Sequence, residues 1–208
     1  FLDDYDIAIV SCAFERSNVD VQVVFNPGGE IAGFAMRPGA PRAMAEAPSY
    51  AKPGSYTETD VTVGEGEWAL PGTLTIPVGE GPFPAVVLVH GSGPQDRDET
   101  VGATKAFRDL ALGLASRGVA VLRYDKRSRV HGAEMVGLAD LTVDEEVVED
   151  AQRAIDVLSE TPRIDDDRLF VVGHSLGGLL APRIAAGQPV AGLVVLAGPT
   201  RPLEELVV

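Results

Sequence analysis

Hydrophobic and polar positions divide this sequence into two segments with different patterns. In the first, residues 5–36, short runs rich in β-branched and aromatic side chains partly alternate with polar residues, as strands do. The runs cover 5–14, 19–25 and 31–36, and the turn sequence "NPGGE" separates the last two. This pattern predicts a β-meander.

The next residues, 37–54, interrupt the pattern. Their sequence, "RPGAPRAMAEAPSYAKPG", is rich in Pro, Gly and Ala and has no hydrophobic period. Such a composition is typical of a linker, so we expect a domain boundary here.

From residue 55 onward, strand patterns alternate with helix patterns. Two runs at 56–63 and 68–77 predict an antiparallel pair of strands. Four later runs are almost entirely apolar, which is typical of strands buried on both faces of a parallel sheet. These four runs cover 85–90, 119–124, 169–173 and 190–198.

Two helical patterns lie between the apolar runs. The first, 104–117, has Thr104 as its expected N-cap, and the second, 142–160, opens with Thr142 and Glu145 at the spacing of a capping box. Strands and helices that alternate in this way predict an α/β fold with a doubly wound, mostly parallel sheet, preceded here by the short meander.

Composition narrows the choice of partners. The 208 residues carry a formal net charge of −14, which disfavours nucleic acid and anionic membrane surfaces as partners. No apolar run approaches the roughly 18 residues that a membrane-spanning helix needs. The sequence begins at Phe1 and shows no signal-peptide pattern. We expect it to be a segment of a longer protein, which leaves the cellular location open between cytoplasm and export.

The sequence "GHSLG" at 173–177 carries the strongest chemical signal. Gly-x-Ser-x-Gly between a buried strand and a helix is the pattern of a nucleophile elbow, with Ser175 as the nucleophile. Gly173 and Gly177 leave room for the strained turn, and the Leu176 N–H is the expected first oxyanion donor. The alternative is a glycine-rich turn with Ser175 as a helix cap.

A second loop supports the catalytic interpretation. The sequence "VLVHGSGPQDRDE" at 87–99 follows the first apolar run of the parallel sheet, where a His-Gly pair commonly shapes the loop with the second oxyanion N–H. We expect Ser92 to supply this N–H, with Gly91 as its neighbour. His90 is expected to hold the loop, and the alternative for it is the catalytic base. The acids at 96–99 are expected to make local hydrogen bonds and ion pairs.

These motifs resemble those of a known family. Residues 55–208, with "HGSGPQDRDE", "LASRGVAVLRYDKR" and "GHSLGG", resemble the α/β-hydrolase superfamily, in its bacterial esterase branch near serine aminopeptidase-like and dienelactone-hydrolase-like proteins. The resemblance implies a serine hydrolase that cleaves small carboxylic esters through an acyl-enzyme and needs no cofactor. Residues 5–36 resemble the last strands of a small α+β domain of unknown function. We therefore expect an accessory-domain part at 1–36, a linker at 37–54 and a truncated hydrolase domain at 55–208.

The resemblance leaves the catalytic base unassigned. The superfamily orders its triad as Ser, acid, His, but residues 176–208 contain neither Asp nor His. We expect both partners to lie beyond this segment. A rearranged triad of Ser175, His131 and Asp125 is the alternative, and His174 is expected to have a packing or supporting role.

Three further expectations complete the sequence analysis. Asp125 and its two basic neighbours are expected to form a polar turn at the pocket rim, with His131 a solvated loop residue. Residues 163–169 are expected to form a solvated acidic turn. The elbow does not separate an esterase from a peptidase or thioesterase, and a non-catalytic binding protein with a decayed triad also remains possible.

Overall fold

The structure is a computed structural model that describes residues 5–13, 18–38, 46–102, 104–136, 138, 140–201 and 205. The chain divides into two compact units, residues 1–45 and 46–208. Among the described residues, no helix is long and apolar enough to cross a membrane.

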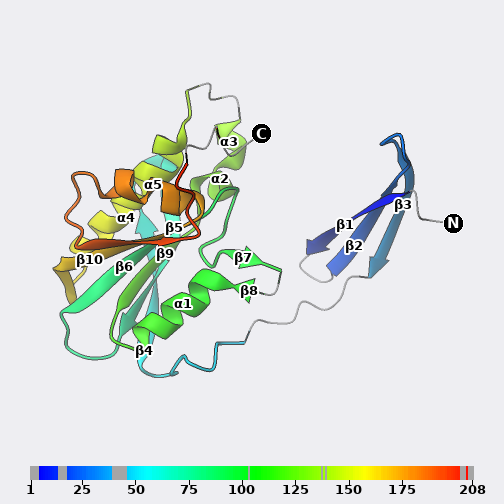
Figure 1. Cartoon of the computed structure of the whole chain (residues 1–208). Coiled ribbons are helices and arrows are strands. Elements are labelled where there is room, and N and C mark those ends of the chain that lie inside the picture. The colour runs from blue at the N-terminus through cyan, green and yellow to red at the C-terminus, as the bar shows by residue number, and fades with distance from the viewer. Residues whose placement is uncertain are drawn as a thin grey trace. The chain divides into compact units, whose positions relative to one another are not determined.

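The first unit is a three-stranded antiparallel sheet. Its strands are β1 (Asp6–Ala13), β2 (Asn18–Phe25) and β3 (Ile31–Pro38), in that order across the sheet (Figure 1). The Asn26 side chain stabilises the turn between β2 and β3, because its Oδ1 accepts the N–H groups of Gly28 and Glu30, each at 3.0 Å. The predicted meander is confirmed.

Both ends of the expected linker at 37–54 belong to the two folded units. β3 extends to Pro38, and residues 39–45 lie outside the described residues. The following residues belong to the second unit: Ala51 is buried, and the Lys52 N–H donates to Ser116 Oγ at 2.8 Å.

The second unit is built on a six-stranded sheet with the order β11-β10-β6-β9-β5-β4. Its strands are β4 (Tyr56–Val63), β5 (Leu70–Pro77), β6 (Phe83–Val89), β9 (Ala120–Tyr124), β10 (Ile164–His174) and β11 (Gly192–Leu196). The last four run parallel, and β4 and β5 form the antiparallel pair at one edge. All six predicted strands are confirmed.

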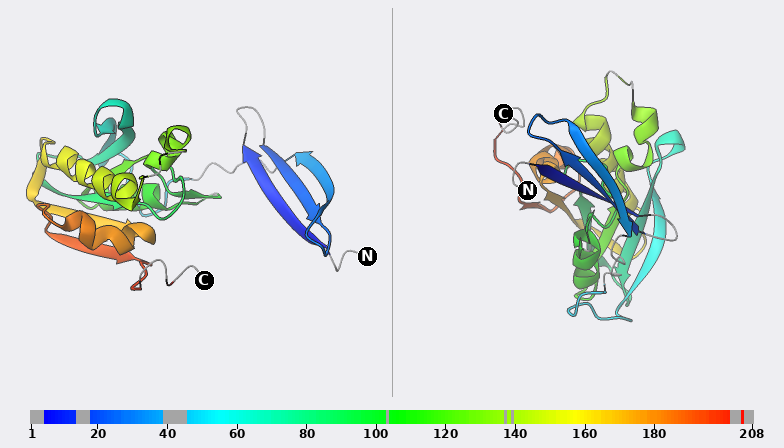
Figure 2. Two further views of the ribbon diagram at one scale, coloured as in Figure 1. Left: turned by 90° about the horizontal axis from the view of Figure 1, so that it is seen from above. Right: turned by 90° about the vertical axis from the view of Figure 1, so that its right-hand side faces the viewer.

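Helices cover both faces of this sheet (Figure 2). The side chains of Val86 and Leu88 on β6 pack on α1 (Ala106–Ala115), and those of Val87 and Val89 face the core on the opposite side of the sheet. The elements on that second face are the π-helical turn η2 (Asp144–Val148), α4 (Glu149–Ser159) and α5 (Leu176–Ala185). This arrangement confirms the doubly wound, mostly parallel fold.

Five short elements complete the unit. They are the 3₁₀ turn η1 (Gly66–Trp68), the hairpin strands β7 (Thr100–Val101) and β8 (Thr104–Lys105), and the short helices α2 (Arg127–Val130) and α3 (Gly132–Met135).

The two predicted helix starts had different outcomes. Thr104 is not a helix cap, because it lies in β8, paired with Val101, and α1 begins after it. Thr142 does cap its helix: its Oγ1 accepts the Asp144 N–H at 3.1 Å, and the Glu145 carboxylate accepts the Thr142 N–H at 2.8 Å.

The predicted turn at 163–169 is also corrected. From Ile164 onward these residues belong to β10, and the register against β6 shifts between Ile164 and Leu169. The irregular part carries the three acidic side chains of 165–167, two of which are exposed and one half-buried.

Candidate active site

Ser175 lies in a sharp turn between β10 and α5. Its backbone has φ +50° and ψ −112°, and such a conformation costs a residue other than glycine about 1–3 kcal/mol. The Ser175 N–H donates to the Leu196 carbonyl at 2.9 Å, and its own carbonyl accepts the Leu179 N–H at 3.0 Å. The strained turn therefore places Ser175 at the N-terminus of a helix, where the helix dipole stabilises an anion.

Close backbone packing surrounds the turn. A Cβ at Gly173 would overlap the carbonyl group of Gly177, and a Cβ at Gly177 would lie 2.7 Å from the carbonyl oxygen of His90. A Cβ at Gly91 would lie 3.4 Å from the Cβ of Ser175. The loop that follows β6 thus lies directly against the serine.

Backbone N–H groups around the serine fall into two sets. Those of Gly177 and Gly91 donate to protein oxygens at 3.0 and 2.9 Å. Those of Leu176 and Ser92 donate to no protein oxygen within the part of the chain that the structure describes. Leu176 and Ser92, the residues that the sequence predicts as oxyanion donors, both belong to the second set.

His90 is buried at the end of β6. Its ring packs against the rings of Phe107 and Tyr124, with centroids 5.3 and 5.2 Å away, and only 1% of the residue is exposed. Burial, with the positive charge of Lys126 second, lowers the pKa of His90 to about 4. The imidazole is therefore neutral at pH 7, and its packing suits support of the loop rather than proton transfer to Ser175.

Glu99 joins the loop to the elbow. This residue is 5% exposed and has φ +48°. Its Oε1 accepts the Gly91 N–H at 2.9 Å and lies 2.8 Å from Nδ1 of His174. One buried carboxylate thus contacts both the loop after β6 and the residue before Ser175.

The structure does not bring the rearranged triad together. His131 Nε2 lies 3.1 Å from the carbonyl oxygen of Ala69, and its ring contacts Trp68 edge-on at 5.3 Å. Asp125 is paired with Arg97, whose backbone N–H and guanidinium donate to it at 2.7 to 3.2 Å. His131 is therefore half-buried in a tryptophan contact, not a solvated loop residue.

The basic residues after Asp125 are not at an exposed rim. Lys126 and Arg127 are 2% and 4% exposed. Arg127 forms a buried ion pair with Asp150 of α4, and burial raises the pKa of this carboxyl although the guanidinium opposes the rise. The turn is polar, as predicted, but its two cations are buried and paired with carboxylates of η2 and α4.

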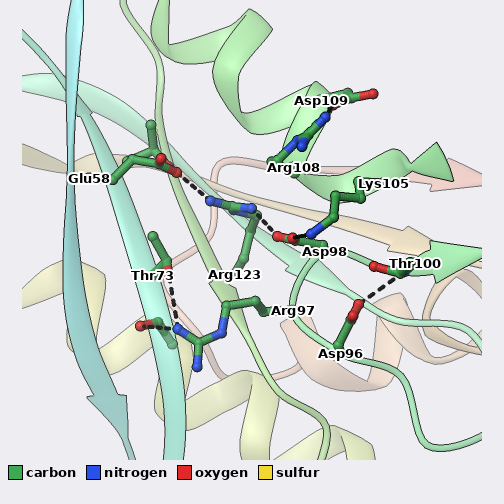
Figure 3. Close-up of polar contacts among 12 residues, drawn as sticks. Glu58, Thr73, Asp96, Arg97, Asp98, Thr100, Lys105, Arg108, Asp109 and Arg123 are labelled. Atoms are coloured by element: carbon green, nitrogen blue, oxygen red, sulfur yellow. Dashed lines mark hydrogen bonds and ion pairs between the residues drawn. The ribbon is translucent and has the colours of Figure 1, made fainter. Parts of the chain in front are cut away.

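The loop 96–99 is anchored to the sheet by ion pairs (Figure 3). Asp96 accepts the Thr100 N–H at 2.9 Å, as the predicted local bonding requires. Asp98 is paired with Lys105 and with Arg123 of β9, which is 3% exposed and reaches Glu58 on β4 as well. The anchoring therefore extends across the sheet, further than the local contacts that we expected.

One acidic cluster has carboxylates close enough to share a metal ion. Among the described residues, the acids at 165–167 place one oxygen each within 4.8 Å of one another. They lie at the start of β10, whereas Ser175 follows its end, about 30 Å away at 3.3 Å per residue. This cluster is not part of the serine site.

The sequence did not single out the contacts that Glu99 and Lys126 make with Gly91, through its N–H at 2.9 Å and its carbonyl at 3.1 Å. Glu99 stood among four charged loop residues, and nothing in the sequence distinguished it from the other three. Lys126 was expected in a polar turn at the pocket rim, and its burial was not foreseen because lysine is seldom buried without a partner.

A strained serine between a parallel strand and a helix, packed against the loop after β6, has the backbone geometry of a nucleophile elbow in an α/β fold. The chain belongs to the alpha/beta hydrolase family, whose family model matches residues 86–207.

Sequence and structural relatives agree with this assignment. Esterase EstD of Thermotoga maritima is 46% identical over 203 residues, which are 98% of this chain and 47% of EstD. The chain therefore spans about half the length of this curated relative. A dienelactone hydrolase from Anabaena variabilis is similar in structure, with TM-score 0.52 and 29% identity over 69% of this chain and 64% of that one.

A dienelactone hydrolase-like promiscuous phosphotriesterase from metagenomic libraries also superimposes, with TM-score 0.53. It is 21% identical and covers 70% of this chain and 60% of its own. At this identity the likeness concerns the fold alone.

Proposed function

We propose that the protein is a serine hydrolase that cleaves small carboxylic esters. Ser175 Oγ attacks the acyl carbonyl carbon while a base removes its proton, and the carbonyl oxygen becomes an oxyanion. Collapse of this intermediate expels the alcohol, which takes up the proton, and leaves an ester on Ser175. Water then attacks that ester and releases the acid.

The observation that carries this proposal is the pair of N–H groups at Leu176 and Ser92. Leu176 follows the strained serine, the loop that carries Ser92 packs against it, and neither N–H donates to a protein oxygen among the described residues. Donors left without a protein acceptor beside a nucleophile suit an oxyanion that exists only during reaction. A serine that merely capped the helix would need no second donor on the loop after β6.

We further propose that the triad acid and histidine come from outside these 208 residues. The three histidines have other neighbours: His90 is buried and neutral, His131 lies at a carbonyl and a tryptophan, and His174 contacts Glu99. Exposure of β11 supports the same view. Side chains 193–196 of this edge strand are apolar and 38–50% exposed, as expected where further chain covers the sheet.

Ester chemistry is favoured over other acyl transfers by the relative EstD, whose name is that of an esterase. We propose that the mechanism needs no cofactor. We also propose that the first unit, residues 1–45, is the end of an accessory domain that precedes the hydrolase domain.

The complete gene product that includes these residues gives the test. It is assayed against p-nitrophenyl acetate and butyrate, an acyl thioester and an aminoacyl p-nitroanilide. We expect ester hydrolysis that Ser175→Ala lowers by about 10³-fold or more. A preference for the anilide or thioester would replace the esterase assignment, and ester turnover that survives Ser175→Ala would refute the serine mechanism.

A further inference from the structure

Lys126 is a buried cation beside the loop that carries Ser92. Its side chain is 3% exposed, and Nζ donates to the Gly91 carbonyl at 3.1 Å and lies 3.3 Å from Oε1 of Glu146. An ammonium taken out of water is costly unless charged and polar groups replace the water. The side chain is therefore held in one place, with a carboxylate on one side and the loop carbonyl on the other.

The carbonyl that Lys126 holds belongs to the same peptide unit as the Ser92 N–H. Among the described residues only the Gly81–Pro82 bond is cis, so the Gly91–Ser92 peptide is trans. In a planar trans peptide the C=O and N–H bonds point in opposite directions. Fixing the direction of the Gly91 carbonyl thus fixes the direction of the Ser92 N–H.

The preceding peptide unit is held independently. The Gly91 N–H donates to the buried carboxylate of Glu99 at 2.9 Å. A carboxylate on one side of Gly91 and an ammonium on the other fix both peptide planes. This arrangement removes the Gly91 N–H as an oxyanion donor and leaves that role to the Ser92 N–H.

We propose that Lys126 is a positioning residue that sets the second oxyanion donor through the Gly91–Ser92 peptide. This inference rests on the proposed function, since it assigns Lys126 a part in the same reaction. The ammonium acts in two ways. It orients the peptide, and it draws electron density toward the Gly91 oxygen, which makes the Ser92 N–H a stronger donor. Lys126 touches no reacting atom itself.

The test compares variants of the complete gene product in p-nitrophenyl ester hydrolysis. Lys126→Met keeps an unbranched side chain, one atom shorter, and removes the charge. Lys126→Arg keeps a cation that can reach the carbonyl. Lys105→Met is the matched control, because Lys105 is ion-paired with Asp98 in the same region but contacts neither Gly91 nor Ser92. Lys126→Gln replaces Lys126→Met if the latter does not fold.

Removing an oxyanion donor costs about 10²–10³ in kcat, so losing its orientation is expected to cost Lys126→Met about 10- to 100-fold. KM is expected to stay within about threefold, because the donor acts on the transition state rather than on bound substrate. Lys126→Arg is expected to recover most of the loss, and Lys105→Met to match the unmodified protein.

A double-mutant cycle separates positioning from general structural support. Ser92→Pro removes the N–H itself, so Lys126→Met should add little further loss in that background. If Lys126→Met lowers kcat by the same factor with and without Ser92→Pro, the inference is overturned while the serine mechanism stands. A Lys126→Met variant with the kcat of the unmodified protein would overturn it as well. Absence of any hydrolysis that depends on Ser175 would overturn the proposed function, and this inference with it.

Discussion

Acidification is expected to destabilise the hydrolase unit through His90. Burial between Phe107 and Tyr124 lowers the pKa of His90 from 6.5 to about 4, whereas an unfolded chain restores the ordinary value. Between these pH values the unfolded state binds one proton more than the folded state. The contribution of His90 to the free energy of unfolding is therefore fully present above pH 6.5 and is lost as the pH falls toward 4.

The size of the effect follows from the shift. Each pKa unit corresponds to about 1.4 kcal/mol, so the difference between 6.5 and about 4 amounts to about 3 kcal/mol. A typical domain has about 5–15 kcal/mol of stability, and the loss is therefore large enough to measure.

Urea unfolding from pH 7.5 to pH 4 measures this effect, with His90→Gln as the comparison because glutamine does not titrate. The free energy of unfolding of the unmodified protein should fall more steeply, by up to about 1.4 kcal/mol per pH unit, so that the difference between the two proteins changes by about 3 kcal/mol between pH 7.5 and pH 4. Parallel curves would refute the assignment of a neutral, buried imidazole.

Two further predictions concern the packing of the fold. Gly177→Ala should destabilise the protein by about 1–3 kcal/mol or more, because its Cβ overlaps backbone carbonyls, whereas Gly132→Ala, in open space on α3, should be nearly neutral. Thermal unfolding compares the two, and equal shifts would contradict the close approach. Asp150→Ala should lower the free energy of unfolding by about 3–5 kcal/mol, because it removes the carboxylate that pairs with the buried cation of Arg127. Removing the exposed Arg183 by substitution to alanine should cost less than about 1 kcal/mol in the same denaturant assay, and a cost similar to that of Asp150→Ala would contradict this ranking.

Much of the sheet could be predicted because a strand buried on both faces needs apolar residues at consecutive positions. The run 85–90 shows this, since alternate side chains of β6 enter the two opposite cores. The start of α1 could not be predicted in the same way. Thr104 has the chemistry of a cap, but it pairs with Val101 in a hairpin that local pattern does not reveal.

The basic residues at 126 and 127 show the same limit at the candidate site. Three charged residues after a strand indicate a solvated turn, because isolated charges are costly to bury. Glu146 and Asp150 lie about twenty residues later and supply the missing partners. Such pairing depends on how η2 and α4 pack on the sheet. The serine motif was easier to find, because its strain and close packing impose glycines at fixed spacing.

The central claim is that Ser175 is the nucleophile, and covalent labelling tests it most directly. The complete gene product is treated with a fluorophosphonate, digested, and analysed by mass spectrometry to find the modified residue. We expect one adduct, on Ser175, which persists in Ser92→Ala because this variant keeps the backbone N–H, and which disappears in Ser175→Ala. An unlabelled folded protein, or an adduct on another serine, would contradict the account.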